Sequence, residues 1–143
     1  MSKLRLRVRF DYEKKEKKRR LLGARDSLEL AEEYRQQKVN LMRNIPVQGI
    51  EIEDIDMSQE VYGVINDLED IRVSYAPVII TFSADSLETA VKYLMKEEFR
   101  IVEFLEPQDI TLSRLELERL MMRINEELLS FKALLERKRD YWK

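Results

Sequence analysis

The sequence predicts an α+β fold with a ferredoxin-like antiparallel sheet in the order β-α-β-β-α-β, an inserted short helix and a long C-terminal amphipathic helix. A repeated segment is the first reason. Asp26–Tyr34 recurs 59 residues later as Asp85–Tyr93, with six of nine positions identical. Each copy begins like a helix, and stretches typical of strands lie around both copies. The chain therefore divides into two β-α-β halves.

Both copies predict a helix start. Asp26 and Asp85 are expected to cap free backbone N–H groups, and a Glu three residues later in each copy can bond back to the cap. The helices are expected over about 27–43 and 86–97. A capping box can arise by convergence, whereas the matching Ala and Tyr later in both copies favour a true duplication, so both origins stay open.

Four segments predict strands. Lys3–Phe10 alternates basic and apolar residues, which indicates one buried and one cationic face. Gly49–Asp56 begins with the same alternation, and Phe99–Leu105 returns as a strand. Ile71–Phe82 is extended, and Pro77 within it marks a bulge or an edge position, because proline cannot donate a ladder hydrogen bond.

The remaining segments predict helix or loop. Tyr12–Arg20 is expected to form a solvated helix extension or a loop, and Ser58–Leu68 a short helix. Ser113 begins a helix of about 28 residues, or roughly 42 Å, which should overhang a sheet of seven-residue strands. We therefore expect an α+β sandwich over residues 1–110 and a long helix over 111–143 that packs on this domain and on a partner.

Composition argues against an enzyme. The chain has no Cys and no His, which removes thiolate nucleophiles and the commonest general base and metal ligand. Its three Gly residues are well separated, so no glycine-rich phosphate loop can be written. We expect no catalytic residue, no cofactor and no metal site.

Charge is unevenly distributed. Residues 1–43 carry a net charge of +7, residues 44–110 carry −11 and residues 111–143 carry +2. The basic third could bind nucleic acid; the candidate contacts are Lys14, Lys15, Lys17, Lys18, Arg19 and Arg20. The alternative is that the cationic and acidic strands are neighbours, with Arg5 or Arg7 paired to Glu51 or Glu53.

An acidic stretch from Glu51 to Asp56 could hold Mg²⁺ or Ca²⁺ through carboxylate oxygens. Along a strand, however, Glu51 and Glu53 face opposite to Asp54 and Asp56, so they cannot converge without a bulge. An edge that is solvated or paired with arginine is the favoured interpretation.

The C-terminal helix is the main functional candidate. Its apolar residues follow heptad spacing, and the expected interface consists of Leu117, Met121, Ile124, Leu128, Phe131, Leu134, Leu135 and Trp142. Such a surface is too apolar to leave in water. Self-association, with a dimer as the first expectation, is favoured over a different partner helix and over docking on a membrane surface.

The sequence therefore predicts a cytoplasmic, non-enzymatic interaction or regulatory module that self-associates through its C-terminal helix. A nucleic-acid-associated protein and a small-ligand sensor are the alternatives. No apolar run approaches the roughly 20 residues of a membrane span.

Overall fold

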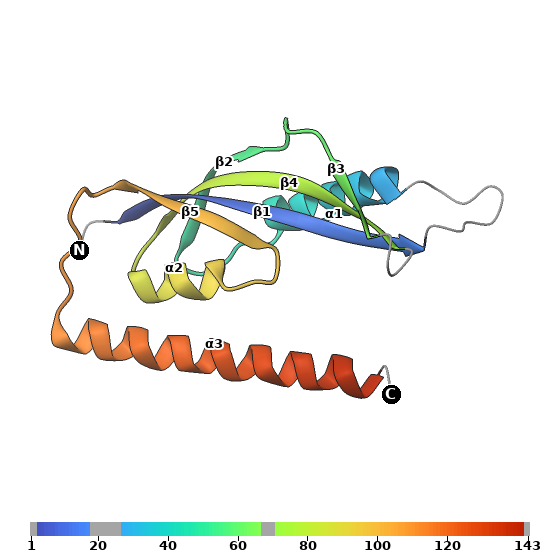
Figure 1. The fold of residues 1–143 in the computed structure, drawn as a ribbon. Coiled ribbons are helices and arrows are strands. Elements are labelled where there is room, and N and C mark those ends of the chain that lie inside the picture. The colour runs from blue at the N-terminus through green and yellow to red at the C-terminus, as the bar shows by residue number, and fades with distance from the viewer. Residues whose placement is uncertain (1–2, 18–26, 67–70, 142–143) are drawn as a thin grey trace.

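The computed structural model describes residues 3–17, 27–66 and 71–141, and this part of the chain has an α+β fold (Figure 1). Its elements are, in order, β1 (Leu4–Lys17), α1 (Ser27–Asn44), β2 (Ile50–Asp56), β3 (Tyr62–Asn66), β4 (Ile71–Ala84), α2 (Leu87–Leu94), β5 (Phe99–Glu106) and α3 (Arg114–Tyr141). The predicted α+β class is confirmed.

The strands form one five-stranded antiparallel sheet in the order β2-β4-β1-β5, and β3 also pairs with β4. β1 and β4, with 14 residues each, pair along their full length in the centre of the sheet. β2 pairs with residues 79–84 of β4 and β3 with residues 71–75. These two short strands therefore follow one another along the same side of β4, and Pro77 lies at the interval between them.

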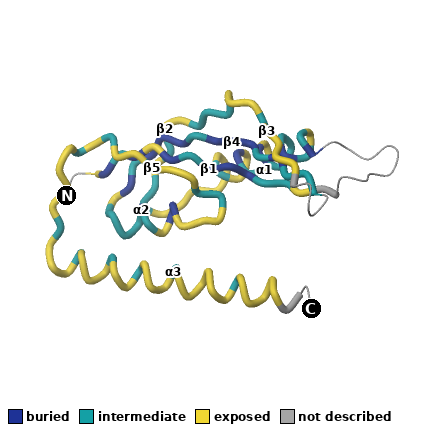
Figure 2. Tube along the Cα trace, in the orientation of Figure 1, coloured by how far each residue is buried: buried dark blue, intermediate teal, exposed yellow. Residues whose placement is uncertain are grey.

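The hydrophobic core lies between one face of the sheet and the helices α1 and α2 (Figures 1 and 2). Alternate residues of the two central strands supply most of it: Leu4, Leu6, Val8, Phe10 and Tyr12 from β1, with Val78, Ile80, Phe82 and Ala84 from β4. The period-two pattern of the N-terminal segment thus predicts the buried face correctly. Both copies of the repeat contribute an alanine to the buried set, Ala31 and Ala90.

Two local predictions are wrong. The first strand does not end near Phe10 but continues to Lys17, because residues 11–17 pair with the first half of the long strand β4. Residues 58–68 contain no helix in their described part; Tyr62–Asn66 is the strand β3 instead. Val64 and Ile65 fit one face of a helix by their spacing. The segment forms a strand instead, because the unpaired side of β4 offers it backbone hydrogen bonds along residues 71–75.

The caps also differ from prediction. Ser86, and not Asp85, caps α2, since the backbone N–H of Thr89 donates to Ser86 Oγ over 3.1 Å. The side chain of Asp85 lies against Gly49, whose φ of +82° and whose close neighbours, 2.8 Å from the position of a Cβ, both favour glycine there. Asp26, the predicted first cap, lies outside the described residues.

Helix α3 forms a separate layer below α2, on the side away from the sheet (Figure 1). The seven-residue strands from which the overhang was predicted are wrong, because the central strands have 14 residues and, at about 3.3 Å per residue, match the helix in length. α3 nevertheless stays largely in solvent, because it packs mainly on the short helix α2 and not on the sheet.

Candidate functional site: the surface of helix α3

Helix α3 is a continuous helix with few attachments to the rest of the chain. Ser113 Oγ accepts a hydrogen bond from the N–H of Glu116 at 3.1 Å, as the predicted capping box requires. Arg123 pairs with Glu88 of α2 at 3.3 Å, and Lys138 pairs with Glu97 at 2.8 Å. Two ion pairs on one side of the helix therefore hold it beside α2.

A groove of about 410 Å³ lies between α3 and the end of α2. Ile124, Phe131 and Leu134 line it from α3, opposite Met95 and Phe99. These side chains make the groove apolar over most of its length, so this side of α3 is only partly withdrawn from water.

Lys96 is the basic residue of the groove lining. Its Nζ lies 4.3 Å from the ring centroid of Tyr93 and 5.0 Å from that of Phe10. Desolvation of the amino group lowers the pKa of Lys96, although Glu98 acts in the opposite direction. The groove thus combines an apolar lining with one cation held over aromatic rings and with two carboxylates, those of Glu97 and Glu127.

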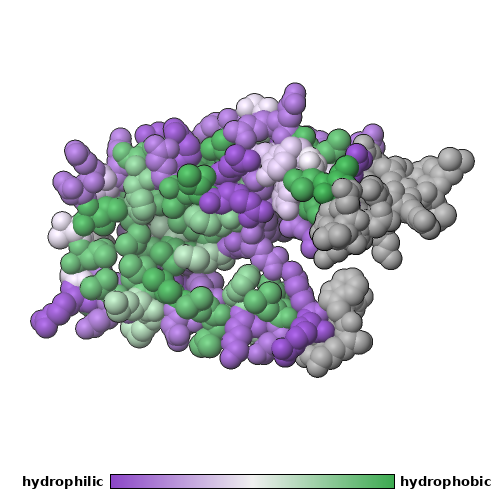
Figure 3. Space-filling model, viewed as in Figure 1, coloured by the Kyte–Doolittle hydropathy of each residue, from purple (hydrophilic) through white to green (hydrophobic). Residues whose placement is uncertain are grey.

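Most of α3 is exposed (Figure 2), and hydrophobic residues gather over α2 and α3 on the visible face of the molecule (Figure 3). On the side of α3 away from the ion pairs with Glu88 and Glu97, the helix carries an exposed apolar stripe. We define this outward stripe as Leu115, Met121, Met122, Leu128, Leu129 and Leu135, whose relative exposures are 54%, 64%, 58%, 62%, 57% and 49%. Six large apolar side chains at about half of full exposure or more, on one side of one helix, are unusual for a surface that stays in water.

The residues predicted as one interface fall on two sides of the helix. Met121 and Leu135 belong to the outward stripe and Leu117 is also exposed, whereas Ile124, Phe131 and Leu134 line the groove. Leu128 lies at the border, because it belongs to the stripe and also lines the groove. Trp142 lies outside the described residues. The heptad pattern missed Leu115, Met122 and Leu129, which recur at seven-residue intervals and could have been found by that spacing.

The outer face of the sheet carries paired charges. Arg5 Nε donates to Glu53 Oε2 over 2.7 Å, and this hydrogen bond raises the pKa of Arg5 and lowers that of Glu53. The prediction that these two strands are neighbours is wrong, since β4 lies between β1 and β2 and presents the small Ser83 at this level. Arg7 pairs with Glu103 of β5 instead, at 3.4 Å.

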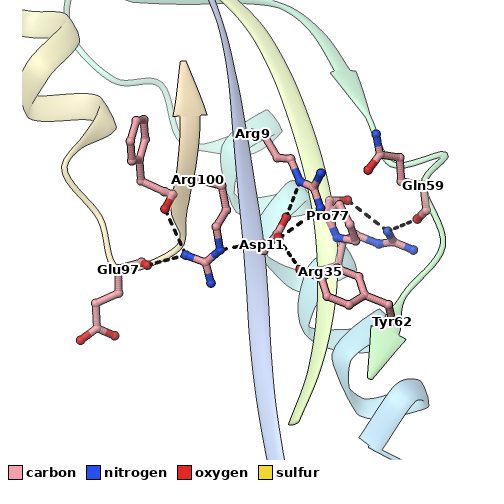
Figure 4. A network of polar contacts seen from close by, with 9 residues as sticks. Arg9, Asp11, Arg35, Gln59, Tyr62, Pro77, Glu97 and Arg100 are labelled. Carbon is pink, nitrogen blue, oxygen red and sulfur yellow. Dashed lines mark hydrogen bonds and ion pairs between the residues drawn. The ribbon is translucent and has the colours of Figure 1, made fainter. Parts of the chain in front are cut away.

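A buried carboxylate joins three strands farther along this face (Figure 4). Asp11 of β1 is 2% exposed and accepts hydrogen bonds from Arg9 Nε at 2.8 Å and from the hydroxyl of Tyr62 at 2.7 Å. Arg100 of β5 approaches it at 3.6 Å. Two arginines and one hydroxyl group surround the carboxylate of Asp11, so this side chain connects β1, β3 and β5.

The basic N-terminal run is described only in part. Lys14 lies 4.5 Å from the ring centroid of Tyr34, and Lys15 pairs with Glu13 at 3.4 Å. Lys17 ends β1, and Lys18, Arg19 and Arg20 lie outside the described residues. Nucleic-acid contact through this run stays a prediction.

Within the described ranges, no group of three acidic side chains is arranged to hold a metal ion, the stretch 51–56 included. In the same part of the chain, no helix has both the length and the apolar character of a membrane span. Comparison with family models, curated proteins and solved structures gives no match for this chain.

Proposed function

We propose that this protein is a cytoplasmic, non-enzymatic interaction module that forms a homodimer through helix α3. The observation that carries the proposal is the outward stripe, with Met121 64% and Leu128 62% exposed. Burying such side chains is worth about 25 cal/mol for each Å² removed from water. A second copy of the same helix offers the same apolar surface and the same length, about 42 Å for 28 residues.

The attachment of α3 supports this proposal. Its described residues 114–139 are all exposed or only half-buried, so the sheet domain alone gives the helix little hydrophobic stabilisation. An amphipathic helix in a protein is usually stabilised by tertiary packing of its apolar face. A dimer contact would supply that packing on the outward side.

Molar mass in solution tests the proposal. We expect the wild-type chain to have the mass of two chains by light scattering at tens of micromolar, and the double variant Met122→Glu, Leu129→Glu to have the mass of one. The control is Leu41→Glu on α1, which changes a similarly exposed leucine, at 50%, on another helix, and should stay dimeric. A monomeric wild type would refute the proposal.

We also propose the ferredoxin-like assignment of the sheet. It is supported by the order β2-β4-β1-β5, if β2 and β3 are counted as two halves of the one strand that would pair with that side of β4. The two helices on one face, α1 and α2, agree with this assignment.

A small-ligand role is a second candidate, and the groove beside Lys96 favours it. A volume of about 410 Å³ lies within the usual range of small-molecule sites. The apolar walls suit an acyl chain, and Lys96 is the one cation of a lining that also holds Glu97 and Glu127, so it is the group that would bind a carboxylate. A thermal-shift series of saturated fatty acids tests this candidate. Stabilisation that is lost in Lys96→Met would support it, and no shift with any chain length would reject it.

A further inference from the structure

We infer that the two copies of α3 pair antiparallel, with the two-fold axis of the dimer passing beside Asn125. This inference rests on the proposed dimer and adds its geometry. It follows from the order of side chains along the outward stripe, which is complementary to its own reverse.

Asn125 lies at the centre of the outward stripe. At about 100° per residue, it points between the pair Met121 and Met122, one turn before, and the pair Leu128 and Leu129, one turn after. In an antiparallel pair centred on Asn125, residues whose numbers sum to 250 lie at the same level. The methionine pair of each copy then lies opposite the leucine pair of the other copy, and apolar groups meet on both sides of the centre.

The charges agree with the same centre. Glu118 comes level with Lys132 of the second copy, and Arg114 comes level with Glu136 of the second copy, so both pairs join opposite charges. All four side chains are exposed, and within the described residues none of them has an ion-pair partner in its own chain. A parallel pair in register would instead bring Glu118 against Glu118 and Lys132 against Lys132, which is unfavourable.

The centre of the pair is polar. Asn125 would meet Asn125 of the second copy, and two asparagine side chains can hydrogen-bond to each other across a helix pair. A single polar residue in such a seam fixes register at a cost in stability. A shift of register by three or four residues would place Asn125 against a methionine or leucine of the stripe, and a shift by seven would place it against Glu118 or Lys132. Each of these shifts would also misalign the charges.

Disulfide cross-linking tests the geometry, because the chain has no cysteine of its own. A disulfide needs Cα atoms within about 7 Å. We expect Asn125→Cys to form a covalent dimer under mild oxidation. Leu115→Cys should not, because its two copies would lie roughly 30 Å apart along the antiparallel pair. Cross-linking through Leu115→Cys that is as efficient as through Asn125→Cys would indicate a parallel pair in register and would overturn the antiparallel pairing.

Charge exchange gives an independent test. Glu118→Lys and Lys132→Glu should each raise the Kd of the dimer by about tenfold. Each change gives residues 118 and 132 the same charge, and these residues of the two copies lie at the same level at two symmetric positions of the pair. The double variant carrying both changes should recover the wild-type Kd, measured by analytical ultracentrifugation. No recovery, with a wild-type chain that is dimeric, would refute this geometry and leave the proposed dimer standing; a monomeric wild type would refute the dimer itself.

Discussion

Arg35 of α1 donates a hydrogen bond from Nη1 to the carbonyl oxygen of Pro77 over 3.1 Å, at the interval between β2 and β3 where β4 has no strand on the side away from β1 (Figure 4). The same nitrogen donates to the carbonyl oxygen of Gln59 over 2.7 Å, and the guanidinium also pairs with Glu32. Arg35 is only 5% exposed. A helix side chain therefore supplies the donor that a neighbouring strand would otherwise provide.

Arg35→Met should lower the free energy of unfolding by about 3 kcal/mol, because it leaves two carbonyl groups and a carboxylate without a buried partner. Urea unfolding followed by circular dichroism measures the change. Arg43→Met is the matched control, since Arg43 is exposed in the last turn of the same helix, and its effect should stay within about 0.5 kcal/mol. Equal effects of the two variants would contradict this role of Arg35.

Asp11→Ala should destabilise the fold by about 3 kcal/mol, because it leaves the guanidinium of Arg9 and the hydroxyl of Tyr62 without their shared acceptor. Tyr62→Phe removes one of these hydrogen bonds and should cost about 1 kcal/mol. Urea unfolding measures both changes. If Asp11→Ala costs no more than Tyr62→Phe, the arginines do not depend on this carboxylate.

Tyr93→Phe should leave stability unchanged or raise it by up to about 1 kcal/mol near neutral pH. The Tyr93 hydroxyl is buried and has no hydrogen-bond partner among the described residues, so its removal relieves a desolvation cost. Thermal unfolding of the two proteins in the same buffer measures the difference. A loss of more than 1 kcal/mol would show that the hydroxyl has a partner.

The pH dependence of the same variant gives a second test. Burial raises the pKa of Tyr93 to about 12, above the value of about 10 for an unfolded tyrosine. The unfolded state therefore loses its proton first, and stability should fall as the pH rises from 10 towards 12. Tyr93→Phe should flatten this fall, and the wild-type absorbance near 295 nm should include a tyrosine that ionises late.

Arg123→Met should loosen α3 without unfolding the sheet domain. Arg123 pairs with Glu88 of α2 and with Glu126 in its own helix, and partly exposed pairs contribute up to about 1 kcal/mol. Hydrogen exchange at low salt should become faster in α3 and stay unchanged in β1 and β4. An equal increase throughout the chain would mean that the helix and the domain unfold together.

The alternating segments predicted most of the sheet. A period-two pattern specifies which face of β1 is buried whatever strand lies next to it. The second copy of the repeat correctly predicted a helix where α2 lies. β3 could not be predicted, because Val64 and Ile65 suit either a strand or a helix and only the free side of β4 decides between them. The sequence predicts an edge or a bulge at Pro77. Pro77 pairs with Asp11 of β1 on one side, and on the other side it lies in the interval where neither β2 nor β3 pairs with β4; the lengths of these two strands, which define this local edge, are not visible in the sequence.

The candidate site was predicted as a helix but not as a surface. Heptad spacing groups Ile124 with Met121, yet the position of α2 turns Ile124 towards the groove and leaves Met121 in solvent. That division depends on where α3 docks, which the ion pairs from Arg123 and Lys138 help to determine. A charged residue in a sequence does not reveal its partner 35 or 41 positions away.

Pro77 also limits how the two central strands can align. The N–H of Asp11, its partner on β1, donates to Glu98, and the carbonyl group of Pro77 faces Arg35, so the nitrogen of Pro77 points away from β1. If β4 slipped by one residue, proline would bring that nitrogen into the ladder with no hydrogen to donate, and every core side chain would change face. One imino acid thus penalises the nearest misfolded pairing of the two longest strands.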